Sequence, residues 1–186
     1  MIKKKLRFRN GLTALWSIIF KKDRKCILGK RNLMSNIVFN WTDGSNKDFG
    51  EFYKKTEEYY SKMVGGIENR RAFVPYNNSD AIPDVLIAYS DDSAVACAGL
   101  KRYSDSDVEI KRVWVEPEYR GRHIAQDIMK YIEDKARELG YKRTILQTRE
   151  IMEDAVGLYT KLGYSKIEKY PPYDNLSGAV CMAKEL

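Results

Sequence analysis

The sequence predicts an α/β domain in which a mixed, mostly antiparallel sheet is flanked by helices. Between residues 85 and 115, three strand-like apolar runs are separated by turn-rich segments at 91–93 and 104–107, which is typical of an antiparallel meander. Apolar residues then recur every four positions from 124 to 136, which predicts a long amphipathic helix that ends at Gly140. This change of period from strand to helix indicates helices packed on a mixed sheet.

The other elements follow from the same periods and from capping signals. Ser45 and Asp48 form a capping box that predicts the start of a helix, and the Gly65-Gly66 pair predicts its end. The expected order is a strand at 37–41, a helix from Ser45 to Gly65, strands at 85–89, 94–101 and 108–115, a helix at 124–139, a strand at 144–148, a helix at 151–162, and strands at 164–170 and 179–184.

Composition excludes several kinds of protein and site. With 186 residues, 44% apolar and 32% charged, the chain is expected to form one globular domain and a tail. Three widely spaced cysteines without a CxxC pair favour a reducing compartment, so a cytoplasmic location is expected. Because His123 is the only histidine, no multi-histidine metal site is expected, and no GxSxG elbow suggests a serine nucleophile.

The charge is concentrated in the first 33 residues. They hold eleven lysines and arginines and one acid, a net charge of +10, so residues 34–186 carry −3 of the total of +7. Three interpretations of this leader stay open: an extension upstream of an authentic start at Met34, an interfacial membrane helix built on residues 12–20, or a cleaved signal peptide. A nucleic-acid function would depend on the leader alone, and none is expected for the domain at 34–186.

A strand that runs through a turn into a helix occupies residues 113–125. The first amides of a helix lack internal partners and lie at the positive end of its dipole, so such a turn can bind an anion such as a pyrophosphate. Gly121 allows close backbone approach, and Arg120 and Arg122 supply positive charge. An ordinary turn with two solvated arginines explains the pattern equally well.

The same segment resembles the pyrophosphate loop of the GNAT superfamily of N-acetyltransferases, R/Q-x-x-G-x-G/A after a strand and V-x-P. His123 departs from that pattern, which usually has glycine there, and a helical histidine whose amide still donates is expected. The resemblance implies the acyl-CoA N-acyltransferase fold, splayed at the coenzyme site, with acetyl-CoA as co-substrate and no metal. The coenzyme contacts it implies are Val113, Trp114, Val115, Arg120, Gly121, Arg122, His123, Ile124 and Ala125.

Residues 155–164 are similar to a second motif of the superfamily, A-x-x-L-Y-x-K-L-G-F/Y. The resemblance implies that Tyr159 points at the coenzyme sulfur, where a phenol can assist the departing thiolate. Periodicity alone favours a core tyrosine on an amphipathic helix. The asparagine that the superfamily often carries earlier on this helix is replaced here by Glu153-Asp154.

The resemblance also implies a base for deprotonating an acceptor ammonium, because the superfamily often uses a glutamate on the strand before the pyrophosphate loop, and Glu109 occupies that place here. It is the carboxylate within the strand at 108–115, and strand alternation predicts that it shares a face with Lys111, Val113 and Val115. A solvent-facing Glu109–Lys111 pair is the alternative. For acceptor binding, Arg71 is a candidate carboxylate ligand and Tyr173 a candidate residue at the cavity mouth.

The predicted function is transfer of an acetyl group from acetyl-CoA to an amine by direct attack, without a covalent enzyme intermediate. A small or amino-acid-like acceptor is favoured, and the protein is expected to be a monomer or homodimer. The alternatives are a non-catalytic module that binds acyl-CoA, and membrane or nucleic-acid binding through the leader.

Overall fold

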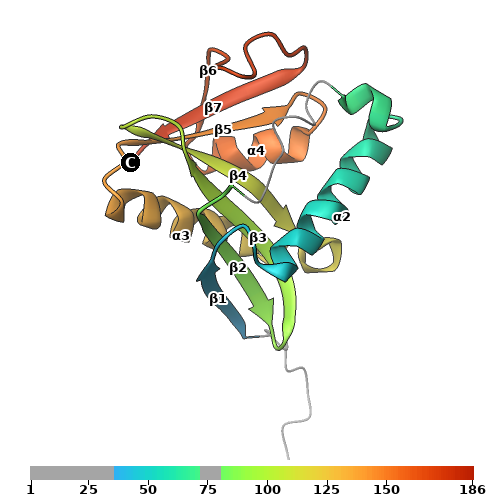
Figure 1. Cartoon of the computed structure of the whole chain (residues 1–186), viewed down its shortest axis with the longest axis vertical. Helices are drawn as coiled ribbons and strands as arrows, with labels where there is room; N and C mark the ends of the chain where they lie inside the picture. The colour runs from blue at the N-terminus through green and yellow to red at the C-terminus, as the bar shows by residue number, and fades with distance from the viewer. Residues whose placement is uncertain (1–35, 72–80) are drawn as a thin grey trace, which may run out of the picture. The chain divides into compact units, whose positions relative to one another are not determined.

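The computed structural model describes residues 36–71 and 81–186, and its core is one seven-stranded sheet (Figure 1). Its strands are β1 (Ile37–Thr42), β2 (Asp84–Ser90), β3 (Ser93–Arg102), β4 (Asp107–Val115), β5 (Arg143–Arg149), β6 (Ser165–Ile167) and β7 (Ala179–Glu185). Its helices are α2 (Lys47–Met63), α3 (Ile124–Glu138) and α4 (Glu153–Lys161), with 3₁₀-helices η1 (Ile67–Arg70) and η3 (Pro117–Tyr119). The predicted order of strands and helices is confirmed.

The strands lie in the order β1-β2-β3-β4-β5-β7-β6. Neighbours pair antiparallel everywhere except between β4 and β5, which are parallel and joined through α3. A parallel pair requires a crossover connection, and the helix predicted from the period of four supplies it. The mixed, mostly antiparallel sheet is therefore confirmed, with its single parallel pair at the centre.

Most element boundaries agree with the expected ones to within one or two residues, and two differences have a clear physical reason. Helix α2 is capped by Asn46, whose side chain accepts hydrogen bonds from the amides of Asp48 and Phe49, while Ser45 bonds to Asp43 instead. The strand expected at 164–170 is shortened to β6, because the chain turns away towards the prolines at 171 and 172, which cannot donate to a sheet.

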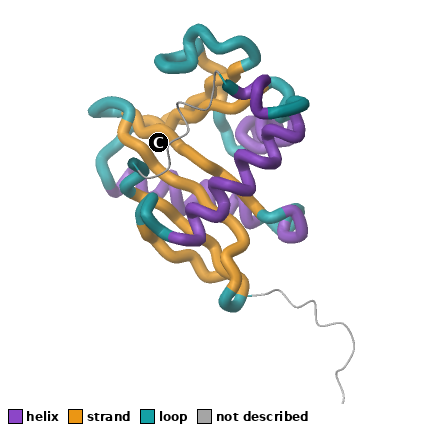
Figure 2. The backbone as a smooth tube through the Cα atoms, turned by 45° about the vertical axis from the view of Figure 1, so that its right-hand side comes forward, coloured by secondary structure: helices purple, strands orange, loops and turns teal. Residues whose placement is uncertain are grey.

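The sheet is covered on both faces. Figure 2 shows the long helix α2 crossing in front of the strands. Under α2, Phe49 and Phe52 pack with Val85, Ile87 and Trp114. The opposite face packs against α3 and α4, whose buried side chains include Ile128, Met129, Ile132 and Tyr159. Farther along the α2 face, Ile145 and Cys181 are covered by Tyr170 and Tyr173 from the loop that joins β6 to β7.

The basic leader and the segment at 72–80 lie outside the described residues, so the interpretations of the leader stay predictions. In the described part of the chain, no helix has the length and apolar character needed to cross a membrane. Among residues 36–71 and 81–186, no group of three or more His, Cys, Asp or Glu side chains is arranged to hold a metal ion.

Candidate functional site

The sheet opens between β4 and β5. Their parallel pairing runs from Asp107↔Arg143 to Ile110↔Leu146 and stops there, although both strands continue. On its other edge β4 carries a bulge, since Cys97 pairs with Trp114 but Gly99 pairs with Lys111, which leaves one extra residue in β4. Arg112 in this bulge has φ 57°, in the left-handed region. A bulge bends its strand and disrupts the ladder locally, which explains the opening at the centre of the sheet.

The bulge also corrects the predicted alternation along β4. Before the bulge, Glu109 is the neighbour of Ile145 on the adjacent strand β5, and both side chains lie on the α2 face. After it, Val113 and Val115 pack in the cluster beneath α3 and α4, whereas Trp114 packs beneath α2. Glu109 and Val113 therefore lie on opposite faces. The prediction that they share a face is wrong, because it assumed an unbroken period of two.

A cavity of about 690 Å³ occupies the opening. Its wall on the side of α3 and α4 includes Val113, Val115, Ile124, Ala125, Leu146, Leu158 and Tyr159. Its wall on the side of α2 includes Thr56, Tyr59, Tyr60, Met63, Val64, Glu109, Lys111, Arg112 and Trp114. The cavity therefore reaches both faces of the sheet, and it brings the two candidate catalytic residues, Tyr159 and Glu109, to one site.

The turn that leads into α3 lines this cavity with unpaired backbone amides. The first i→i−4 bond of the helix runs from the Asp127 amide to the His123 carbonyl (3.1 Å). Among the described residues, the amides at 121–126 have no hydrogen-bond acceptor, as is normal for a helix start. Gly121, with φ 73°, has open space where a side chain would begin. This turn has the donor set and the dipole that an anionic group requires.

His123 is not helical, contrary to the sequence expectation. It is the N-cap of α3, with φ 63° and ψ 5°, and no side-chain hydrogen bond caps the helix. Only glycine adopts this left-handed conformation without cost, which gives a physical reason for the usual glycine at this position. The side chain of His123 also lines the cavity, where a glycine would leave more room.

From the sequence, both arginines of this turn are expected to supply charge near the phosphates. In the structure the two lie in different places. The Arg120 guanidinium donates from Nε to the Val115 carbonyl (3.0 Å) and lies over the rings of Trp114 (4.9 Å) and Tyr59 (5.3 Å). Arg120 lines the cavity from the α2 side, whereas Arg122 lies over Tyr119 (4.9 Å) and is not among the lining residues.

Tyr159 lies on α4 and is 8% exposed. Burial raises the pKa of its phenol, and the nearby Tyr60 adds to the effect. Its hydroxyl therefore stays protonated at neutral pH and can donate a proton or hydrogen bond. The ring packs edge-on against Tyr164, with 5.9 Å between the ring centroids.

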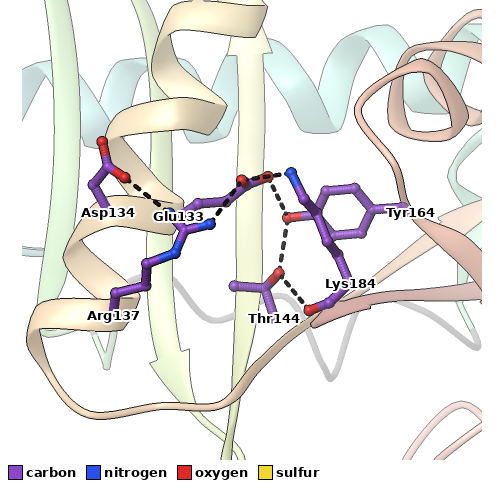
Figure 3. Close-up of polar contacts among 6 residues, drawn as sticks. All are labelled: Glu133, Asp134, Arg137, Thr144, Tyr164 and Lys184. Carbon is purple, nitrogen blue, oxygen red and sulfur yellow. Dashed lines mark hydrogen bonds and ion pairs between the residues drawn. The ribbon is translucent and has the colours of Figure 1, made fainter. Parts of the chain in front are cut away.

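Behind Tyr159, a buried polar network joins α3 to β5 and β7 (Figure 3). The Tyr164 hydroxyl donates to Glu133 Oε1 (3.2 Å) and lies 2.9 Å from Thr144 Oγ1. Glu133 also accepts from Lys184 Nζ (2.6 Å). Because the Tyr164 ring packs directly against Tyr159, this network holds in place the ring that supports the candidate catalytic phenol of Tyr159.

Glu109 lies on the α2 side of the cavity, within a cluster of polar contacts. Its Oε1 accepts hydrogen bonds from Tyr170 (3.1 Å) and Lys111 (3.3 Å), and Lys111 Nζ also contacts the Tyr173 hydroxyl (2.5 Å). Burial lowers the pKa of Lys111, while the charge of Glu109 opposes that shift. Burial raises the pKa of Tyr170, and the Glu109 charge raises it further. The predicted Glu109–Lys111 pair exists, but it does not face solvent, because the side chains are only 8% and 11% exposed.

Neither of the two acceptor candidates is among the described residues that line the cavity. Tyr173 is 3% exposed and packs in the cluster with Tyr170 and Ile145. Arg71 projects outward, paired with Glu68 (2.6 Å), and does not line the cavity. Sequence reasoning missed the hydrogen bond from Tyr170 to Glu109 and the α2 wall. The spacing of Thr56, Tyr60 and Met63 could have identified that wall as one face of a helix.

Comparison with known proteins gives a family match over most of the described chain. The family model described as "Acetyltransferase (GNAT) family" matches residues 41–164. "IAA acetyltransferase" of Azospirillum brasilense is 30% identical over 96 residues, 50% of this chain and 63% of that protein. "N-acetyltransferase 8B" of Homo sapiens is 32% identical over 85 residues, 43% of this chain and 37% of that protein. The matched part of the chain thus spans less than two thirds of these relatives.

Solved structures match the fold over nearly their whole length. A putative acyl-CoA N-acyltransferase from Klebsiella pneumoniae superposes with a TM-score of 0.67 at 20% identity, covering 82% of this chain and 99% of that one. A GNAT family acetyltransferase from Elizabethkingia anophelis, solved with acetyl-CoA bound, gives 0.59 at 16% identity, covering 82% and 99%. At these identities the likeness concerns the fold.

Proposed function

Since the chain belongs to the Acetyltransferase (GNAT) family, we propose that it is an enzyme that transfers an acetyl group from acetyl-CoA to a primary amine. The observation that carries the proposal is the shared cavity. The open amides at the start of α3, the Tyr159 phenol and the Glu109 carboxylate all line it. An anion site, a proton donor and a proton acceptor are the groups that this transfer requires.

The start of α3 and the edge of β4 would hold the coenzyme. The amides at 121–126 would donate to its pyrophosphate, because they have no other acceptor among the described residues and the helix dipole favours negative charge there. Beyond Ile110, β4 has lost its β5 partner, so its edge near Val113 and Val115 can pair with the amide groups of the pantetheine arm. The solved Elizabethkingia relative binds acetyl-CoA on the same fold.

Two side chains would move protons. Glu109 would take the proton from the acceptor ammonium, since an ammonium has no lone pair with which to attack a thioester. Tyr159 would donate to the sulfur as the carbon–sulfur bond breaks, and burial keeps its hydroxyl protonated for this duty. Once Glu109 holds the ammonium proton, the free amine would attack the thioester carbon directly. As the tetrahedral intermediate collapses, the carbon–sulfur bond breaks, the sulfur takes the Tyr159 proton and leaves as the thiol, and the nitrogen returns its surplus proton to the Tyr159 oxygen. Glu109 would then release its proton to solvent.

The rival function is binding of acyl-CoA without catalysis. His123 at the N-cap of α3 and Glu153-Asp154 at the start of α4 are the departures from the superfamily pattern that favour it. A thiol-release assay with a broad panel of primary amines separates the two. Amine-dependent thiol release is expected; a coenzyme-dependent rise in melting temperature without any thiol release would support the binding module instead. If neither occurs at millimolar coenzyme, the proposal is overturned.

A further inference from the structure

The acceptor side of the cavity is defined by the bulge in β4. If the coenzyme enters at the start of α3 and lies along Val113 and Val115, it approaches from the α3 and α4 face. The amine must then come from the α2 face, where Glu109 lies. The composition of the α2 wall therefore determines which amines fit. This step rests on the proposed function and identifies the substrate class for the same site.

The α2 wall is apolar and aromatic. Tyr59, Tyr60 and Met63 line the cavity from the helix, and Trp114 lines it from β4. Tyr59 and Met63 are 37% and 36% exposed, so both offer apolar surface that a ligand can cover. Removing such surface from water is favourable in proportion to its area, and aromatic rings add edge or stacking contacts.

Among residues 36–71 and 81–186, the two carboxylates closest to this wall already have basic partners. Glu109 is paired with Lys111 (3.3 Å) and Glu57 with Arg112 (2.9 Å), and the four side chains are 8–17% exposed.

Arg120 adds a guanidinium that lies over Tyr59 and Trp114. Glu57 itself does not line the cavity, and the remaining acids among the described lining residues, Glu153 and Asp154, belong to α4 on the opposite face. A second ammonium group on the acceptor would thus lose water without gaining a carboxylate, which is costly.

We propose that the acceptor is a monoamine with an aromatic or alkyl body, which packs against Tyr59, Tyr60 and Met63 while its amine reaches Glu109. Polyamines are excluded by the paired acids and by the Arg120 charge. Glu109 accepts the proton of a single amine group, and the apolar wall selects the body that carries this amine.

A matched pair of amines tests the proposal on the unaltered protein. Hexylamine and cadaverine have equal numbers of non-hydrogen atoms, but cadaverine ends in a second ammonium where hexylamine ends in a methyl group. We expect kcat/KM for hexylamine to exceed that for cadaverine by about tenfold or more, and phenylethylamine to be at least as good as hexylamine. Equal values, or a preference for cadaverine, would overturn the proposal.

A charge introduced into the wall tests the cause of the preference. Met63→Glu adds a carboxylate without a basic partner, so the ratio of hexylamine to cadaverine kcat/KM should fall by about tenfold. Ile67→Glu is the matched control, because Ile67 is also exposed (51%) and lies four residues away but does not line the cavity. It should leave the ratio unchanged. A Met63→Glu ratio equal to that of Ile67→Glu would show that α2 does not contact the acceptor.

Failure of this proposal can be told from failure of the proposed function. Thiol release with other amines but not with hexylamine or phenylethylamine would refute the substrate class and retain the transferase. Absence of thiol release with every amine would refute the transferase itself, and with it the substrate class.

Discussion

The ring of Tyr164 lies edge-on against Tyr159 at 5.9 Å, while its hydroxyl is held between Glu133 and Thr144. The hydroxyl groups of the two tyrosines therefore have different surroundings, although the residues are only five positions apart in the sequence. Tyr164 has its hydroxyl bonded within the core, whereas Tyr159 turns its side chain to the cavity. Removal of each hydroxyl should consequently affect a different property of the protein.

Tyr159→Phe should lower kcat by about 10²-fold with little change in the KM for acetyl-CoA or in stability, because the hydroxyl acts mainly in the transition state. Tyr164→Phe is the contrasting control. It removes a buried donor to Glu133 and should reduce the free energy of unfolding by about 1–3 kcal/mol while retaining most of the rate. Steady-state kinetics and denaturant unfolding measure both. If Tyr159→Phe leaves kcat unaltered, the Tyr159 hydroxyl has no part in the reaction and the residue contributes packing alone.

Glu109→Gln should lower the rate of transfer, and the loss should shrink as pH rises. At high pH the acceptor amine is already neutral, so a base is needed less. The measurement is the pH profile of kcat/KM for the variant against the unaltered enzyme. A defect that stays constant with pH would instead mark Glu109 as a residue that holds Lys111 and Tyr170 in place.

His123→Gly should raise the melting temperature, because glycine relieves a left-handed conformation that costs about 1 kcal/mol for other residues. It should also tighten acetyl-CoA binding by opening the start of α3. Gly121→Ala is the reciprocal control at φ 73° in the same turn, and it should lower the melting temperature. Thermal unfolding with and without the coenzyme measures both effects. An unchanged or lower melting temperature for His123→Gly would contradict the account of this turn.

Tyr89 links the sheet to α2 by donating its hydroxyl to Asp48 Oδ2 (2.8 Å). Burial, and then this hydrogen bond, raise the pKa of Tyr89 from 10.0 to about 12. A raised folded-state pKa means that the stabilisation is complete below pH 10 and is lost as pH rises from 10 to 12. The difference in unfolding free energy between the unaltered protein and Tyr89→Phe should decline over that interval. A difference that does not vary with pH would show that Tyr89 contributes only packing.

The architecture was predictable because each element has a local signal. The meander is marked by its Asp/Ser turns, and α3 by apolar residues at every fourth position, ending before Gly140. The α2 cap was misplaced by one residue because Ser45 and Asn46 are both good caps, and tertiary context decides between them.

The site was predictable only in part. The turn into α3 and Tyr159 have sequence motifs, and both line the cavity. The bulge at Arg112 has no such signal, because no glycine marks its left-handed residue, so the alternation along β4 was extended through it. Contacts of Glu109 with Tyr170 join residues 61 positions apart, and only the order of β4, β5 and β7 brings them together.

The most direct test of the account follows a labelled acetyl group in a single turnover. The enzyme in excess is mixed with acetyl-labelled acetyl-CoA and hexylamine, and the protein and small molecules are analysed by mass spectrometry at successive times. The account predicts that the label passes to the amine in step with thiol release and that no acetylated protein appears at any time. Label on the protein before it reaches the amine, or release of all the label as acetate, would contradict direct transfer within this cavity.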